Sequence, residues 1–251
     1  MIKFFRKIRY DLMEKNKTGK YLKYAIGEII LVVIGILIAL SINNWNQKRI
    51  VKNQVSEYLL SIVSDLKSDI TEYEHNIEVF EKGIENHRRL LINDDYKELE
   101  IDSIAELMLR FWNLNRTSSQ TFEKIKNTGL QEILGNAEIN QAVNYYYNVS
   151  LSHYDYLINW DKELSQRDAV FWLYNDQYES GFSNEFKITS SIPYKDDSNK
   201  RKEALIKLVE STLGRNYLRN AITRSEFGLN LVRGIKSKAE NLVRLIEISK
   251  K

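Results

Sequence analysis

The 251-residue sequence contains no cysteine and one proline, Pro193. Without cysteine the protein forms no disulfide and offers no thiol nucleophile or thiolate metal ligand. Because proline interrupts helix interiors, its near-absence favours long uninterrupted helices. The sequence also lacks the alternation of apolar and polar residues that is typical of β-strands, and it contains no repeat of fixed period. We therefore predict an all-α fold.

Short catalytic and nucleotide-binding motifs are also missing. The sequence has no P-loop, dinucleotide-binding glycine motif, nucleophile elbow or zincin motif. Glu72 and His75 form one Glu-x-x-His step, which di-iron helical bundles use in pairs, but neither His87 nor His153 has a glutamate three residues earlier. We expect no metal site, no cofactor and no enzymatic activity.

Positive charge is concentrated at the N-terminus. Residues 1–23 contain eight Lys/Arg and two acidic residues, which leaves 29 basic and 32 acidic residues in 24–251. A basic face spread over a folded domain is typical of nucleic-acid binding, so we expect no nucleic-acid partner. The basic segment either lies on the membrane surface as an amphipathic helix or serves only to direct membrane insertion. The candidates for surface contact are Lys3, Arg6, Lys7 and Arg9.

A long apolar run follows the basic segment. Residues 25–42 contain one charged side chain, Glu28, among eighteen residues. A helix of this length spans about 27 Å, close to the thickness of the bilayer hydrocarbon. The run is apolar on all sides, unlike a core helix, and longer than the apolar region of a signal peptide. Aromatic residues flank it, namely Tyr21, Tyr24 and Trp45. We predict one uncleaved transmembrane helix over 24–45.

The flanking charges predict the orientation of this helix. Eight basic residues precede it, whereas Lys48, Arg49 and Lys52 follow closely. The positive-inside rule then places residues 1–23 in the cytoplasm and residues 46–251 across the membrane, which is the periplasm if the host is Gram-negative. We predict a single-pass inner-membrane protein with a periplasmic all-helical domain.

Two segments resemble a known family. The start of the chain reads MIKFFRKIR and then KYLKYAIGEIILVVIGILIALSINNWN. It resembles the IGEIxLVVIGILIALxINNWN signature of a Bacteroidota family of uncharacterised single-pass membrane proteins. Residues 121–147, TFEKIKNTGLQEILGNAEINQAVNYYY, are similar to the second recurrent segment of that family. The resemblance implies a location in the cell envelope and implies no activity.

The predicted membrane helix carries candidates for contact with a partner. Gly27, Gly35 and Ala39 lie on one helical face, and such a stripe would permit close approach of a second helix, including a homo-oligomer through the span. Glu28 either extends to the inner interface or pairs with a group on a partner's membrane helix, since charges within membranes are costly and often functional. The lipid bilayer is the first expected partner.

A heptad seam follows the membrane helix. Its residues step by four and three: Leu59, Val63, Leu66, Ile70, Tyr73, Ile77, Phe80, Ile84, His87 and Leu91. The seam could form a parallel homodimeric coiled coil, but its bulky and polar members fit better inside a bundle. We predict packing within one chain against a C-terminal helix over 217–248. The expected contact residues are Leu218, Ala221, Val232, Ile235, Ala239, Leu242 and Ile246.

The remaining chain predicts shorter helices and one loop. A capping box at Ser103 and Glu106 predicts a helix over 103–112. A helix is predicted over 119–129, and a second short helix ends at Gly135. Longer helices are predicted over 137–175 and 200–213, with a loop over 180–199. Long helices with short connections favour a bundle of antiparallel helices.

Aromatic residues are dense between 145 and 178. They either pack in the core, which their helical spacing favours, or line a groove for a sugar, lipid or peptide. The sequence thus predicts a non-catalytic, membrane-anchored cell-envelope protein that scaffolds or binds other envelope proteins. The alternative is a sensor-like periplasmic ligand-binding bundle that signals through a membrane partner.

Overall fold

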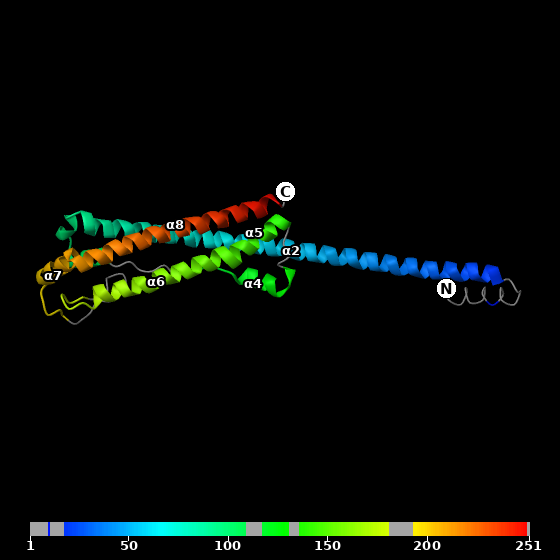
Figure 1. Ribbon diagram of the computed structural model, residues 1–251, viewed down its shortest axis with the longest axis horizontal. Coiled ribbons are helices and arrows are strands. Elements are labelled where there is room, and N and C mark those ends of the chain that lie inside the picture. The colour runs from blue at the N-terminus through cyan, green and yellow to red at the C-terminus, as the bar shows by residue number, and fades with distance from the viewer. Residues whose placement is uncertain (1–9, 11–17, 109–116, 131–135, 181–192, 250–251) are drawn as a thin grey trace. The chain divides into compact units, whose positions relative to one another are not determined.

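The computed structural model describes residues 10, 18–108, 117–130, 136–180 and 193–249, and every regular element in these ranges is helical (Figure 1). This confirms the all-α prediction for the described chain. The elements are α2 (Thr18–Ile92), the 3-10 turn η1 (Asp95–Glu98), α3 (Ile101–Met108), α4 (Gln120–Asn127), α5 (Ala137–Tyr145), the π-helical turn η3 (Tyr146–Leu151), α6 (Ser152–Leu173), α7 (Ser198–Glu210) and α8 (Thr212–Ile248). Contacts divide the chain into two units, Met1–Glu57 and Tyr58–Lys251.

The first unit contains the apolar part of α2. Its large apolar side chains between Ile29 and Ile42 are 46–63% exposed. Among the described residues, one helix is long and apolar enough to cross a membrane, judged by length and composition. The predicted apolar helix is therefore present.

The predicted transmembrane helix over 24–45 and the heptad seam that follows it lie in one continuous helix. Both belong to α2, which runs for 75 residues. Residues 36–82 contain neither glycine nor proline, so nothing in the sequence interrupts the backbone hydrogen bonds between the two predicted helices.

In the second unit, α8 lies antiparallel to α2 (Figure 1). Four ion pairs join the two helices at regular intervals: Lys67–Glu247 at 2.8 Å, Glu74–Lys236 at 3.0 Å, Glu81–Arg233 at 2.6 Å and Arg88–Glu226 at 2.6 Å. The four α2 members are spaced by seven residues, so they follow one face of the helix. We call this set the charge ladder.

The charge ladder disfavours one alternative register of the two helices. Sliding α8 by one heptad along α2 would oppose like charges at three places: Glu74 with Glu247, Glu81 with Glu240, and Arg88 with Arg233. Like-charge pairs between facing helices are unfavourable, so the ladder selects the observed alignment over this one.

The predicted seam is largely correct. Seven of its ten residues are buried as predicted, namely Leu59, Val63, Leu66, Tyr73, Phe80, Ile84 and His87. The second buried line is Ile62, Asp69, Asn76, Gly83 and Leu90, whereas Ile70, Ile77 and Leu91 of the predicted seam are only partly buried. The reason is that α2 contacts α8 on one side and η3 and α6 on another, so its buried face is wider than a two-helix seam and rotated from it.

The C-terminal partner of the seam was predicted correctly. All seven residues expected on the contact face of α8 are buried within this chain. Gly228 permits close approach of the two helices, because a Cβ atom there would lie 2.5 Å from Cζ of Phe80. A separate apolar cluster around Ile104, Trp172 and Leu205 is shared by α3, α7 and the end of α6.

The predictions for the shorter elements have mixed outcomes. The helix α3 begins at Ile101, so Ser103 lies inside it and forms no capping box. The helix predicted over 137–175 is α5, η3 and α6, with a π-helical turn that apolar periodicity does not reveal. Ser119 does precede α4, and Gly129 adopts a positive φ of 71° after it. Gly135 and most of the predicted 180–199 loop lie outside the described residues.

Candidate functional site

A layer of polar side chains crosses the core of the second unit where α2, η3 and α6 meet. We call it the polar layer; its members are Asp69, Tyr73, Asn76, Tyr146, Tyr147 and Tyr154, each at most 5% exposed. The Tyr73 and Tyr146 hydroxyls are hydrogen-bonded at 2.9 Å, and the Asn76 side-chain amide donates to the Tyr154 hydroxyl at 3.0 Å. These bonds join α2 to η3 and α6 through the interior.

Asp69 is the charged member of the polar layer. Its Oδ1 accepts a hydrogen bond from the Ser118 backbone N–H at 2.9 Å, just before α4. Its Oδ2 is buried and accepts no hydrogen bond from a described residue. Burial is the main cause that raises the pKa of Asp69 from 3.8 to about 6, opposed by the Ser118 hydrogen bond and reinforced by Asp65, Asp155 and Glu72.

The tyrosines of the polar layer remain neutral. Burial raises the pKa of Tyr73, Tyr146, Tyr147 and Tyr154 well above the ordinary value. Tyr147 stacks on Phe122 of α4 with ring centroids 4.6 Å apart and an interplanar angle of 4°. The α4 segment is therefore held by an aromatic stack and by the Asp69–Ser118 hydrogen bond.

A second buried charged group joins α6 to α8. Arg224 Nε donates to Asp161 Oδ1 at 2.9 Å, and its terminal nitrogen donates to Asp168 Oδ2 at 2.6 Å and to Ser165 Oγ at 3.4 Å. The side chains of Arg224 and Asp161 are 8% and 5% exposed. In this arrangement, the arginine cluster, one buried cation is shared between two carboxylates.

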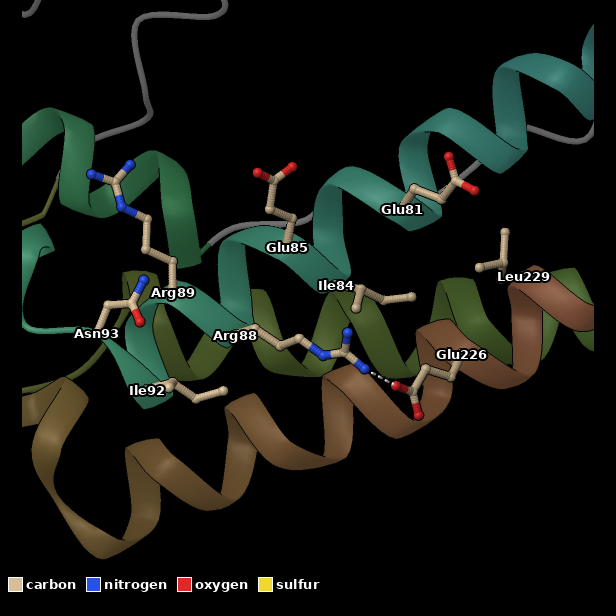
Figure 2. A pocket seen from close by; sticks show the side chains of 9 residues that line it. All are labelled: Glu81, Ile84, Glu85, Arg88, Arg89, Ile92, Asn93, Glu226 and Leu229. Carbon is tan, nitrogen blue, oxygen red and sulfur yellow. Dashed lines mark hydrogen bonds and ion pairs between the residues drawn. The ribbon is translucent and has the colours of Figure 1, made fainter.

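A surface hollow of about 530 Å³ lies between α2 and α8 (Figure 2). Figure 2 shows Arg88 reaching from α2 to Glu226 of α8, with Ile84 and Leu229 nearby. Glu85 is exposed and forms no ion pair with a described residue, and Ile92 is 75% exposed. This α2–α8 groove therefore offers charges of both signs beside apolar surface.

A smaller groove of about 220 Å³ lies between η3 and α8. Its lining includes the exposed Tyr145 ring and Lys238, whose Nζ donates to Ser150 Oγ at 3.2 Å. Turns of π-helix are often found at functional sites, and η3 contributes Tyr146 and Ser150 to this wall.

The residues predicted to contact a partner within the membrane lie on α2. No described atom outside the helix lies within 4 Å of a Cβ atom built at Gly27 or Gly35, and Ala39 is exposed. Glu28 lies in the same helix and is partly exposed. The use of these residues by a partner helix remains a prediction. The basic residues Lys3, Arg6, Lys7 and Arg9 lie outside the described residues.

The aromatic cluster divides between core and surface. Tyr146, Tyr147, Tyr154 and Trp172 are buried, while Tyr145, Tyr156, Trp160 and Tyr174 are exposed. The buried members therefore pack in the core, and the exposed members remain available for contact. His75 and His153 are exposed, and in the part of the chain that the structure describes no three His, Asp or Glu side chains are placed to hold a metal ion.

Sequence reasoning missed Asp69, Asn76 and Arg224. The signal for the first two was present: they continue the seven-residue spacing that begins with Ile62 on α2. Arg224 falls between Ala221 and Gly228 on the buried face of α8. Polar residues inside an otherwise apolar stripe were the available clue.

The family comparison covers part of the chain. Residues 28–133 match the model of DUF6090, a family of unknown function. This range includes most of the apolar run and Asp69, and it ends before α5. No curated protein and no solved structure matches the sequence. The match agrees with the resemblance to an uncharacterised domain family.

Proposed function

We propose that this protein is a single-pass cell-envelope protein that acts without catalysis as a membrane-tethered module for binding other proteins. The observation that carries the proposal is the fully exposed apolar run of α2, followed in the chain by a separately packed helical unit. An exposed run of this length is unfavourable in water and favourable in a bilayer.

The charge distribution supports one orientation. Eight Lys/Arg in residues 1–23 favour a cytoplasmic N-terminus, which places the unit Tyr58–Lys251 in the periplasm of a Gram-negative host, as an extracytoplasmic helical bundle anchored in the inner membrane. Reporter fusions after residue 60 test this. A periplasmic reporter should be active and a cytoplasmic reporter inactive; the reverse pattern, or a mature N-terminus near Ser41, contradicts the proposal.

The α2–α8 groove is the surface that suits a protein partner best. It combines an exposed carboxylate, Glu85, which forms no ion pair with a described residue, with the exposed apolar Ile92. A partner segment with a basic and an apolar side chain would complement it. Interfaces of proteins combine apolar contact with a polar rim in this manner.

Affinity purification from detergent-solubilised membranes tests the groove. The full-length protein should recover a partner, and the double substitution Glu85→Lys with Ile92→Ser should lose it. The matched control is Glu163→Lys with Val170→Ser, which changes an exposed acid and an exposed apolar residue of α6. Equal recovery with both variants would contradict the groove, and no partner with the unchanged protein would contradict the binding role.

A sensor-like ligand-binding bundle is the second candidate. The groove beside η3 favours it, because an aromatic ring, a lysine and a π-helical turn meet there. Thermal unfolding of the full-length protein with a panel of small anionic amphiphiles separates the two: a saturable rise in melting temperature that Lys238→Ala abolishes would favour the sensor.

A further inference from the structure

The α4 segment, residues 117–130, is attached to α2 through a carboxylate that has no cationic partner among the described residues. Asp69 is 1% exposed, it accepts one hydrogen bond from Ser118, and its second oxygen is orphaned among the described residues. Tyr147, which stacks on Phe122 of the same segment, also has a buried hydroxyl without a described hydrogen-bond partner. A buried ionised carboxylate in such surroundings is costly.

We propose that Asp69 is a proton-binding residue and that its protonation strengthens the docking of the α4 segment on α2. In the docked state the carboxyl group is shielded from water, and the proton removes the charge that burial disfavours. When the segment undocks, Asp69 regains water and the charged form is no longer penalised. Protonation and docking therefore favour each other.

Among the described residues, no positive charge acts strongly on Asp69. The groups that interact with it are Asp65 and Glu72 on α2, Asp155 on α6, and the neutral tyrosines Tyr73, Tyr146, Tyr147 and Tyr154. The α4 segment contributes the Ser118 backbone N–H. All the charges that act strongly on Asp69 from the described residues are negative, so they favour uptake of a proton.

The pH range of the effect follows from linkage. The pKa of Asp69 is about 6 in the docked state, and the ordinary value of 3.8 applies once the carboxyl is solvated. The docked state therefore takes up a proton between these values and is favoured as the pH falls. Between pH 7.5 and pH 5 the docking equilibrium should strengthen about tenfold.

Thiol labelling tests the proposal directly, because the chain has no native cysteine. Ile125 of α4 is fully buried, so a thiol placed by Ile125→Cys reacts when the segment undocks. The reaction rate is measured in the full-length protein at pH 7.5 and pH 5, alone and combined with Asp69→Asn. The double variant is the matched control, since it carries the same thiol and reports the intrinsic pH dependence of the reagent.

We expect Ile125→Cys alone to slow about tenfold more than the double variant on acidification. An equal pH dependence in the two proteins would overturn the proposal. A comparable slowing caused by Mg²⁺ or Ca²⁺ at constant pH would also overturn it, because the orphaned oxygens would then hold a metal ion. Hydrogen exchange of residues 117–130 in the unsubstituted protein is the second readout, and protection that does not rise on acidification, after correction for intrinsic exchange, contradicts the proposal even if a variant fails to fold.

Discussion

The polar layer and the arginine cluster both bury charge inside the second unit, yet they treat it in opposite ways. Arg224 meets Asp161 and Asp168 at 2.9 Å and 2.6 Å, so each buried charge has an opposite partner. Asp69 is more deeply buried, and its strongest described charged neighbours are acids. One cluster contains a countercharge, and the other contains none among the described residues.

The difference shows that burial alone does not decide the cost of a charge. A buried ion pair recovers much of its desolvation free energy through attraction and hydrogen bonds, and removing one partner exposes that cost. An uncompensated carboxylate carries the cost permanently and reduces it by taking up a proton. Replacing an aspartate by asparagine should therefore stabilise the protein at Asp69 and destabilise it at Asp161.

The largest effect is expected at Arg224. Replacing it in Arg224→Met leaves Asp161 and Asp168 buried without their cation, and we expect the free energy of unfolding to fall by about 3–5 kcal/mol. Urea denaturation of the full-length protein in detergent measures the change. The exposed Arg233→Met is the control and should cost less than about 1 kcal/mol. A loss at Arg224 no larger than the loss at Arg233 would mean that the cluster is not compensated by ion pairing.

The second predicted change in the free energy of unfolding has the opposite sign. Asp69→Asn removes the uncompensated charge and keeps an oxygen for the Ser118 N–H. A rise in pKa from 3.8 to about 6 corresponds to at most about 3 kcal/mol, and water screening lowers it, so we expect a gain of about 1–3 kcal/mol at pH 7.5. Asp161→Asn should instead destabilise. Urea denaturation compares the two, and a loss of stability in both variants would remove the distinction between the clusters.

The pH dependence of that gain sharpens the comparison. Since the folded-state pKa of Asp69 lies above the unfolded value, its penalty is present above about pH 6 and disappears as the pH falls towards 3.8. The stability difference between Asp69→Asn and the unsubstituted protein should shrink by roughly 1 kcal/mol from pH 7.5 to pH 5. Paired urea titrations at the two pH values measure it. A difference that stays constant would place the pKa of Asp69 outside this range.

The smallest effect concerns the exposed charge ladder. Arg88 and Glu226 are 56% and 46% exposed, so their pairing contributes little. We expect Arg88→Glu to cost less than about 1 kcal/mol and the added Glu226→Arg to restore most of the loss. Thermal unfolding at low and high salt measures both variants. If the double variant stays as unstable as the single one, the pair does not contribute to the register.

Several features of the fold follow from local sequence alone. The apolar run of residues 25–42 predicted a helix exposed on all sides, because length and composition decide that property without a partner. The scarcity of proline predicted long helices, and α2 runs for 75 residues. The apolar face of α8 was identified before its partner was known, since helical spacing places those residues together.

Tertiary structure decided which face of α2 is buried and which polar residues accompany it. Asp69 and Asn76 look like surface residues in a seam of apolar side chains, and they become interior only because η3 and α6 pack beside α8 against α2. Arg224 likewise gains its acidic partners from a helix about 60 residues away in the sequence. Sequence periodicity reports the average polarity of a face. The burial of a single charge depends on elements distant in the chain, and so does its compensation.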